Sequence, residues 1–203
     1  MTHHVLDMPA TEAQVRALKL GDTAMLEKTL FGIRDATLIA MFDRGRTTRL
    51  DLTGHAVIHT APNVRKVEAS AHDPAGYAPL CIGTTTSIRM ERFTRLLMER
   101  EGVRIIIGKG GMGPQTTQAL RDLGGAYLAV VGGAAALETT WIEAIEDVDL
   151  DDLHPESLWK FRIRNFGPLL VTMDSHGNSL HAQVQADAAA KRAAILASLG
   201  ASE

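Results

Sequence analysis

The chain has 203 residues, of which 45% are hydrophobic, and its formal net charge is −3. This length and composition predict one domain over residues 1–203 with a sizeable core. The 21 Lys and Arg residues are scattered rather than gathered into a basic stripe, which argues against nucleic acid as a partner. No apolar run approaches the ~20 residues that span a bilayer, and the N-terminus lacks a signal-peptide core, so we expect a soluble, cytoplasmic protein.

The first half of the chain alternates predicted helices and strands. In chain order they are a helix over 11–20, a strand over 23–30 that Gly32 closes, a helix over 33–42 and a strand over 56–60. The segment 69–79 contains Pro and Gly and is expected to be a surface loop or a tolerated insertion.

The second half continues this alternation and indicates an α/β protein. After Gly83 comes a run of four hydroxyl residues, Thr84 to Ser87, which is called the hydroxyl run below. An amphipathic helix is predicted after it, with Ile88, Phe93, Leu96 and Leu97 on one face. The elements that follow are a strand over 105–107, a helix over 114–123, a strand over 127–131, a turn at Gly132-Gly133 into a helix, a strand over 168–173 and a helical tail over 183–199. A strand, a helix and a strand in succession imply a βαβ crossover and at least one parallel pair.

The most informative segment is a glycine-rich loop after the strand over 105–107. Glycines at 108, 110, 111 and 113 surround Lys109, and Pro114 then opens a helix. Free N–H groups at such a helix start, approached without a Cβ in the way, predict a site for a carboxylate or phosphate. The alternative is a tight turn with a solvated lysine. A nucleotide P-loop is excluded because Gly110 stands where Ser or Thr is needed, and the match to the dinucleotide glycine fingerprint is weak.

A second helix opening, at residues 84–89, also follows a predicted strand. Open α/β sheets bind ligands at the carboxyl ends of their strands, so neighbouring openings would bring Arg89, Lys109 and several hydroxyls into one pocket. Thr85 and Arg89 are four residues apart and share a face if the helix begins at Thr85. Arg34, after Gly32, is a third candidate cation. Cations from separate segments suit a small dianionic substrate.

The remaining reactive side chains favour structural roles. Cys81 is the only cysteine, which excludes a disulfide within the chain and a cysteine-ligated cluster held by this chain alone. We expect Cys81 to be a buried, inert thiol, with a nucleophilic role as the minor alternative. His59 is expected to be a hydrogen-bonded histidine at a strand end, although it could line the site. Residues 174–178 predict a hairpin turn rather than a site.

Four segments of the sequence carry a resemblance to a known family. They are Gly83-Thr-Thr-Thr-Ser-Ile-Arg-Met90, Ile107-Gly-Lys-Gly-Gly-Met-Gly-Pro114, Pro155-Glu-Ser-Leu-Trp159, and Phe166-Gly-Pro168 with Asp174-Ser-His-Gly-Asn178. In this order they resemble the beta subunit of L(+)-tartrate dehydratase and, equally, the carboxyl-terminal part of the iron–sulfur (class I) fumarate hydratases. The likeness runs from about Leu20 to Ala182, and residues 183–203 form the helical tail.

The resemblance implies a fold, a reaction and a partner. The fold would be a swivelling β/β/α domain with a mixed central sheet flanked by helices. The reaction would add or remove water on a four-carbon dicarboxylic acid. The substrate would be either L-tartrate or the pair fumarate and malate. The sequence does not separate them, although its motifs resemble the tartrate dehydratase subunit slightly more. A larger alpha subunit would hold a [4Fe–4S] cluster through three cysteines, while this chain would bind no metal. The assembly would be a hetero-oligomer, or contain a homodimer of beta chains, and this chain alone would be inactive.

The resemblance also implies roles for individual residues. Arg34, Arg89 and Lys109 would bind carboxylates, and Thr85 would take part in proton transfer, so that Thr85, Arg89 and Lys109 form the expected catalytic set. The expected substrate-binding set is Arg34, Thr84, Thr86, Gly110 and Gly111. The family commonly has a His shortly after its Arg-Asp pair, where this chain has Ala36-Thr-Leu-Ile39. The alternative function is a dicarboxylate-binding or regulatory module without catalysis.

Overall fold

The fold is organised around one mixed sheet that brings several strand ends together. The computed structural model describes residues 1–130 and 135–199. Among them, seven strands pair in the order β1-β2-β3-β6-β7-β9-β8. Their bounds are β1 His3–Asp7, β2 Thr23–Ile33, β3 Ala56–His59, β6 Ile105–Gly108, β7 Ala126–Ala129, β8 Ile142–Asp149 and β9 Leu158–Met173.

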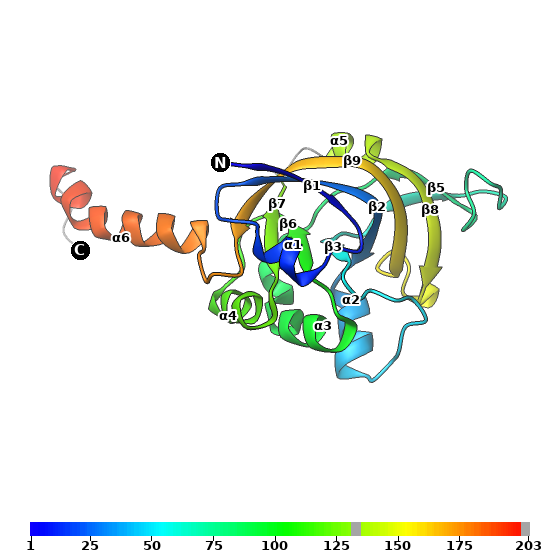
Figure 1. Cartoon of the computed structure of the whole chain (residues 1–203). Helices are drawn as coiled ribbons and strands as arrows, with labels where there is room; N and C mark the ends of the chain where they lie inside the picture. The colour runs from blue at the N-terminus through cyan, green and yellow to red at the C-terminus, as the bar shows by residue number, and fades with distance from the viewer. Residues whose placement is uncertain (131–134, 200–203) are drawn as a thin grey trace.

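Strand β9 turns the sheet back on itself. The pairs β1–β2, β2–β3, β3–β6 and β6–β7 are parallel, whereas β9 runs antiparallel to β2, β7 and β8. Because β9 pairs with both β7 and β2, the five strands β2, β3, β6, β7 and β9 close into a ring, over which β9 curves in Figure 1. The expected mixed sheet and the parallel pair around the crossover helix are confirmed.

Helices cover one face of the sheet (Figure 1). These helices are α2 Asp35–Leu38, the 3₁₀ helix η2 Ser87–Phe93, α3 Thr94–Glu101 and α4 Pro114–Leu123, and α2, α3 and α4 lie together below the sheet in Figure 1. The strands β3 and β6 are buried along their whole length, as expected of parallel strands covered on both faces. Pro114 opens α4, and Gly124, in the left-handed conformation, ends it.

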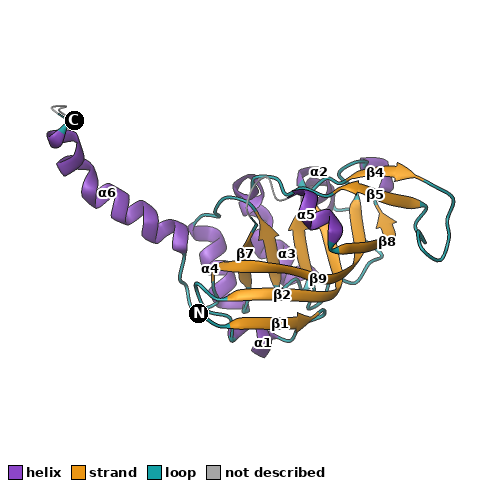
Figure 2. Cartoon of the chain, turned by 90° about the horizontal axis from the view of Figure 1, so that it is seen from above, coloured by secondary structure: helices purple, strands orange, loops and turns teal. Residues whose placement is uncertain are grey.

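Two parts of the chain lie outside the seven-stranded sheet and its covering helices. The strands β4 (Asn63–Lys66) and β5 (Tyr77–Cys81) form a separate two-stranded sheet, and the helix α6 (Leu180–Ser198) projects from the body (Figure 2). No residue of α6 is buried. Within residues 1–130 and 135–199, no helix has the length and apolarity needed to cross a membrane. The remaining elements are α1 Glu12–Arg16, the π-helix η1 Ile39–Asp43, α5 Ala135–Thr140 and the 3₁₀ helix η3 Asp151–Leu153.

The structure corrects several expectations from the sequence. Cys81 is exposed rather than buried, at the end of β5 in the separate two-stranded sheet. Ile88 is 46% exposed, because η2 rather than an α-helix follows the hydroxyl run, which changes the residues that face inward. The strands β1, β4, β8 and the first half of β9 were not predicted, and residues 77–79 belong to β5. The expected turn at Gly132-Gly133 lies outside the described residues.

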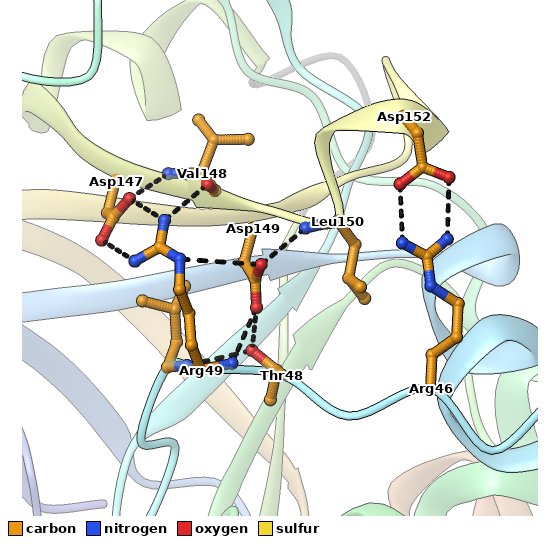
Figure 3. Close-up of polar contacts among 9 residues, drawn as sticks. Arg46, Thr48, Arg49, Asp147, Val148, Asp149, Leu150 and Asp152 are labelled. Atoms are coloured by element: carbon orange, nitrogen blue, oxygen red, sulfur yellow. Dashed lines mark hydrogen bonds and ion pairs between the residues drawn. The ribbon is translucent and has the colours of Figure 1, made fainter.

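Ion pairs fasten the loop after η1 to the end of β8. Arg49 donates to both carboxylate oxygens of Asp147, at 2.7 and 2.5 Å, and Arg46 grips Asp152 in the same way, at 2.7 Å for both bonds (Figure 3). The Thr48 hydroxyl donates to Asp149 at 2.6 Å. Each exposed pair contributes little by itself, but paired Arg–carboxylate bonds in a network set geometry. These contacts fix the loop after η1, which lies downstream of Arg34 and α2 in the chain.

Gly32 should not tolerate a side chain. A Cβ there would lie 2.8 Å from Phe161 Cε2 and 2.9 Å from Thr60 Cγ2. Both neighbours are buried, so Gly32→Ala should lower the free energy of unfolding by about 1–3 kcal/mol through overpacking, measured by urea denaturation. Gly45→Ala is the control, since nothing lies within 4 Å of its Cβ and only the cost of a left-handed backbone applies. Unchanged stability of Gly32→Ala would contradict this packing.

Candidate functional site

Arg34, which follows β2, and Arg89, which follows the hydroxyl run, both contact the carboxylate of Asp35. Arg34 is the first residue after β2, and its Nε lies 3.4 Å from Asp35 Oδ2 and 3.4 Å from Glu156 Oε1. Arg89 reaches the same Asp35 from η2, with Nη2 3.0 Å from Oδ2 and Nε 3.3 Å from Oδ1. Asp35 therefore ties together two segments that lie 54 residues apart.

The charge of Asp35 is maintained by this contact. Burial acts to raise the pKa of Asp35, but the hydrogen bond and the charge of Arg89 outweigh burial, so the pKa lies below its usual value. Glu156 accepts a hydrogen bond from the Ala36 amide at 2.7 Å, which fixes the start of α2. The two carboxylates partly balance the two guanidinium groups.

Thr85 lies within reach of Arg89. The Arg89 Nη2 donates to Thr85 Oγ1 at 3.1 Å, and the Thr85 amide donates to the His59 carbonyl at 2.9 Å. The expected contact between residues 85 and 89 is thus present, although the helix begins at Ser87. Since Arg89 hydrogen-bonds the hydroxyl oxygen, it favours negative charge on that oxygen.

The glycine loop lies directly beside the hydroxyl run. Thr86 and Lys109 pair as an isolated parallel bridge, and the Ser87 amide donates to the Lys109 carbonyl at 3.2 Å. Gly110 has a φ of +73°, a left-handed conformation that glycine adopts without strain. Across residues 1–130 and 135–199, the Lys109 side chain makes no ion pair or hydrogen bond. It is a cation without a bound counterion, unlike Arg34 and Arg89.

Ser87 joins the two loops through a buried hydrogen-bond network. Its Oγ lies 2.9 Å from His59 Nδ1 and accepts from the Tyr127 hydroxyl at 3.0 Å. The same Tyr127 hydroxyl is 3.1 Å from the Gly110 carbonyl, to which it can also donate. A Cβ at Gly108 would overlap Ser87 Oγ and lie 2.9 Å from the Tyr127 hydroxyl, so this loop requires a glycine there.

Burial holds both ring groups of this network in their neutral forms. It lowers the pKa of His59 to about 4 and raises the pKa of Tyr127 to about 12. The expectation that His59 is a hydrogen-bonded histidine at a strand end is confirmed.

A groove of about 910 Å³ lies next to these loops, between the glycine loop and the start of α6. Thr86, Gly111 and His181 are in its walls, and the His181 ring packs so closely that a Cβ on Gly111 would lie 2.6 Å from its Cγ. Among its described lining residues, Arg89 and Lys109 are absent. The cations therefore lie beside the groove rather than within it.

The expected site residues are largely gathered in space. Asp35 links Arg34 to Arg89, which is bonded to Thr85. Thr86 is bridged to Lys109, and Ser87 and Tyr127 connect Lys109 with Gly110. Thr84 pairs with Thr60, the first residue after β3, through an isolated antiparallel bridge.

Reasoning from the sequence assigned no role to Asp35, Glu156, Ser87 or Tyr127. Glu156 lies in the segment 155–159 and Asp35 directly follows Arg34, but the contacts that explain them join distant parts of the chain. Within the part of the chain that the structure describes, no group of three His, Cys, Asp or Glu side chains could hold a metal ion.

His59 should make the stability of the protein sensitive to acid. The unfolded chain binds a proton near the ordinary pKa of 6.5, whereas the buried ring does so only near 4. Stability is therefore fully present above about pH 6.5 and is lost as the pH falls through 4, by up to about 3 kcal/mol. In urea denaturation from pH 7 to 4, His59→Asn should lose less stability than the wild type. His72→Asn, at an exposed histidine, should follow the wild type. Identical pH dependence of His59→Asn and wild type would contradict the burial of a neutral ring.

Comparison with known proteins identifies the family. The sequence model of the family described as "Fumarase C-terminus" matches residues 2–184. The chain is 36% identical over 180 residues to the L(+)-tartrate dehydratase subunit beta of Escherichia coli K12, covering 88% of this chain and 87% of that protein. It is 35% identical over 179 residues to a putative L(+)-tartrate dehydratase subunit beta of Methanocaldococcus jannaschii, with 86% and 89% covered.

A longer relative matches equally well. The chain is 40% identical over 181 residues to a putative class I fumarate hydratase of Geobacillus stearothermophilus, covering 89% of this chain but 34% of that protein. The chain thus spans about a third of the length of this relative. These matches cover the strands, the hydroxyl run and the glycine loop, and the chain belongs to the Fumarase C-terminus family.

Proposed function

We propose that this chain is the beta subunit of a hydro-lyase that adds or removes water on a four-carbon dicarboxylic acid, in an active site shared with a second subunit. The observation that carries the proposal is the Lys109 ammonium, which has no partner within residues 1–130 and 135–199, on a glycine loop bridged to the segment that holds Thr85 and Arg89. The names of the relatives support the reaction class and the division into subunits.

The cations suit the charge that this reaction develops. Removing a proton from the carbon next to a carboxylate spreads negative charge onto that carboxylate. Cations that are already in place stabilise the transition state more than the ground state. Lys109 is the cation best able to accept a substrate carboxylate, because it has no bound counterion among the described residues. Arg34 and Arg89 already share Asp35 and can bind a second carboxylate with their remaining N–H groups.

Thr85 is the proposed group for proton transfer. A threonine hydroxyl is a weak base in water, so its alkoxide needs stabilisation by a neighbouring positive charge. Arg89 supplies it through the 3.1 Å hydrogen bond, while the bond from the Thr85 amide to His59 fixes the backbone. Substrate protons would move to or from Thr85 Oγ1 on the face shared with Arg89.

The residues of this chain do not fit an iron–sulfur cluster. Cys81 is its only cysteine and lies exposed in β5. We therefore propose that the [4Fe–4S] cluster is held by three cysteines of the alpha subunit, and that the group receiving the substrate hydroxyl belongs to that subunit. Of the two substrate pairs, we favour L-tartrate and oxaloacetate over fumarate and malate, because residues 83–90 and 155–159 resemble the beta subunit of tartrate dehydratase.

The dependence on a partner can be tested by reconstitution. The purified chain should be colourless and inactive, and turnover of L-tartrate, fumarate or malate should appear only after anaerobic assembly with the three-cysteine subunit. Turnover by the isolated chain would contradict the shared site.

Single substitutions in the assembled enzyme test the residue roles. Lys109→Ala should lower kcat/KM by about 10²–10³-fold, the usual cost of one group that stabilises developing charge. Thr85→Val should lower kcat by about 10²–10⁴-fold with little change in KM, whereas Thr85→Ser should keep most activity. Lys66→Ala, at an exposed lysine of β4, is the control and should behave as wild type. Wild-type kinetics of Lys109→Ala would contradict its role.

A further inference from the structure

A buried carboxyl group near the glycine loop has no role in the function proposed above. Glu138 lies in α5 and is 1% exposed. Neither of its carboxylate oxygens has a hydrogen-bond partner in the described part of the chain. An unpaired buried carboxyl is costly, and the cost is far larger for the charged form than for the neutral acid.

The helix α5 that carries Glu138 is bonded to the residue before Gly83. Thr139, the neighbour of Glu138, accepts a hydrogen bond from the Ile82 amide at 2.9 Å, directly before Gly83 and the hydroxyl run. The Val130 amide, directly after β7, donates to the Gly108 carbonyl at 2.9 Å, directly before Lys109. The residue after Glu138 is thus bonded to the residue before Gly83, and the residue after β7 is bonded to the residue before Lys109.

Lys109 is the charged group that acts on Glu138. Burial raises the pKa of Glu138 to about 7, and the positive charge of Lys109 opposes that rise. Both groups lack another partner within residues 1–130 and 135–199, so each is the available counterion of the other.

Other titratable groups near α5 are engaged elsewhere. The helix packs against β5 and β8. Strand β5 carries Tyr77, which packs against Trp159, and the exposed Cys81. The acidic groups of β8 pair with basic groups of β9 or of the loop after η1, namely Glu143 with Arg162 and Arg164, Glu146 with Lys160 and Arg162, and Asp147 and Asp149 with Arg49.

We propose that Glu138 is a positioning residue for Lys109, which leaves the ammonium free for a substrate carboxylate when protonated and withdraws it as a counterion when ionised. Substrate binding and ionisation of Glu138 then compete, so binding of the dianion is coupled to the uptake of one proton by Glu138. This inference rests on the proposed function, because it assigns a carboxylate ligand to Lys109.

Steady-state kinetics of the assembled enzyme test the competition. With L-tartrate and fumarate as probes between pH 6 and 8.5, the wild-type KM should rise above about pH 7, towards about tenfold per pH unit, as one linked proton requires. Glu138→Gln should keep a low KM across this range, while kcat follows the wild type. Glu138→Asp should retain a rising KM. Glu101→Gln is the matched control, since burial also raises the pKa of Glu101 but it lies in α3. A wild-type pH slope in Glu138→Gln would overturn the proposal.

Thermal unfolding of the full chain tests the pair without substrate. A carboxyl whose pKa is raised on folding loses stability as the pH rises from its unfolded value near 4.5 through about 7. The Tm difference between Glu138→Gln and the wild type should therefore increase over that pH range. In a Lys109→Ala background the midpoint pH of this increase should move to higher pH, because the opposing charge is gone. An unmoved midpoint would overturn the pairing. Absence of dicarboxylate turnover together with a moved midpoint would instead reject the proposed function and leave the pair standing.

Discussion

The candidate site depends on the hydrogen bonds that join Ser87 to the rest of the protein. Its amide holds the Lys109 carbonyl, and its hydroxyl meets His59 and Tyr127, two rings buried in neutral form. Removal of water makes such bonds stronger and makes their loss more costly. The hydroxyl run and the glycine loop therefore cannot separate without leaving buried polar groups unpaired.

The hydrogen bonds of Ser87 keep two kinds of cation close together: arginines fixed by carboxylates and a lysine that can bind a substrate carboxylate. Arg34 and Arg89 are oriented by Asp35 and Glu156, which fix their planar groups and partly neutralise them. Within residues 1–130 and 135–199, only the backbone of Lys109 is hydrogen-bonded, and its positive charge acts on the buried Glu138. A dianion entering between these groups would meet oriented guanidinium groups at one end and a free ammonium at the other.

Much of this could be predicted from the sequence, because the relevant signals are local. Glycines 108, 110, 111 and 113 around Lys109 predicted the loop, and the four-residue spacing predicted the contact of Thr85 with Arg89. The ring of strands was not predicted, because its closure depends on long-range pairing of β9 with β2 and β7. The exposure of Cys81 likewise depends on the long-range arrangement of the separate sheet formed by β4 and β5. Glu138 carries no local pattern at all, and only its burial distinguishes it.

The most direct test of the shared carboxylate site is a crystal structure of the assembled enzyme with succinate, an unreactive four-carbon dianion. One succinate carboxylate should lie within about 3 Å of Lys109 Nζ, the range of a charge-assisted hydrogen bond, and the other should contact Arg34 or Arg89. Succinate bound away from Lys109, with the ammonium facing solvent, would contradict the account.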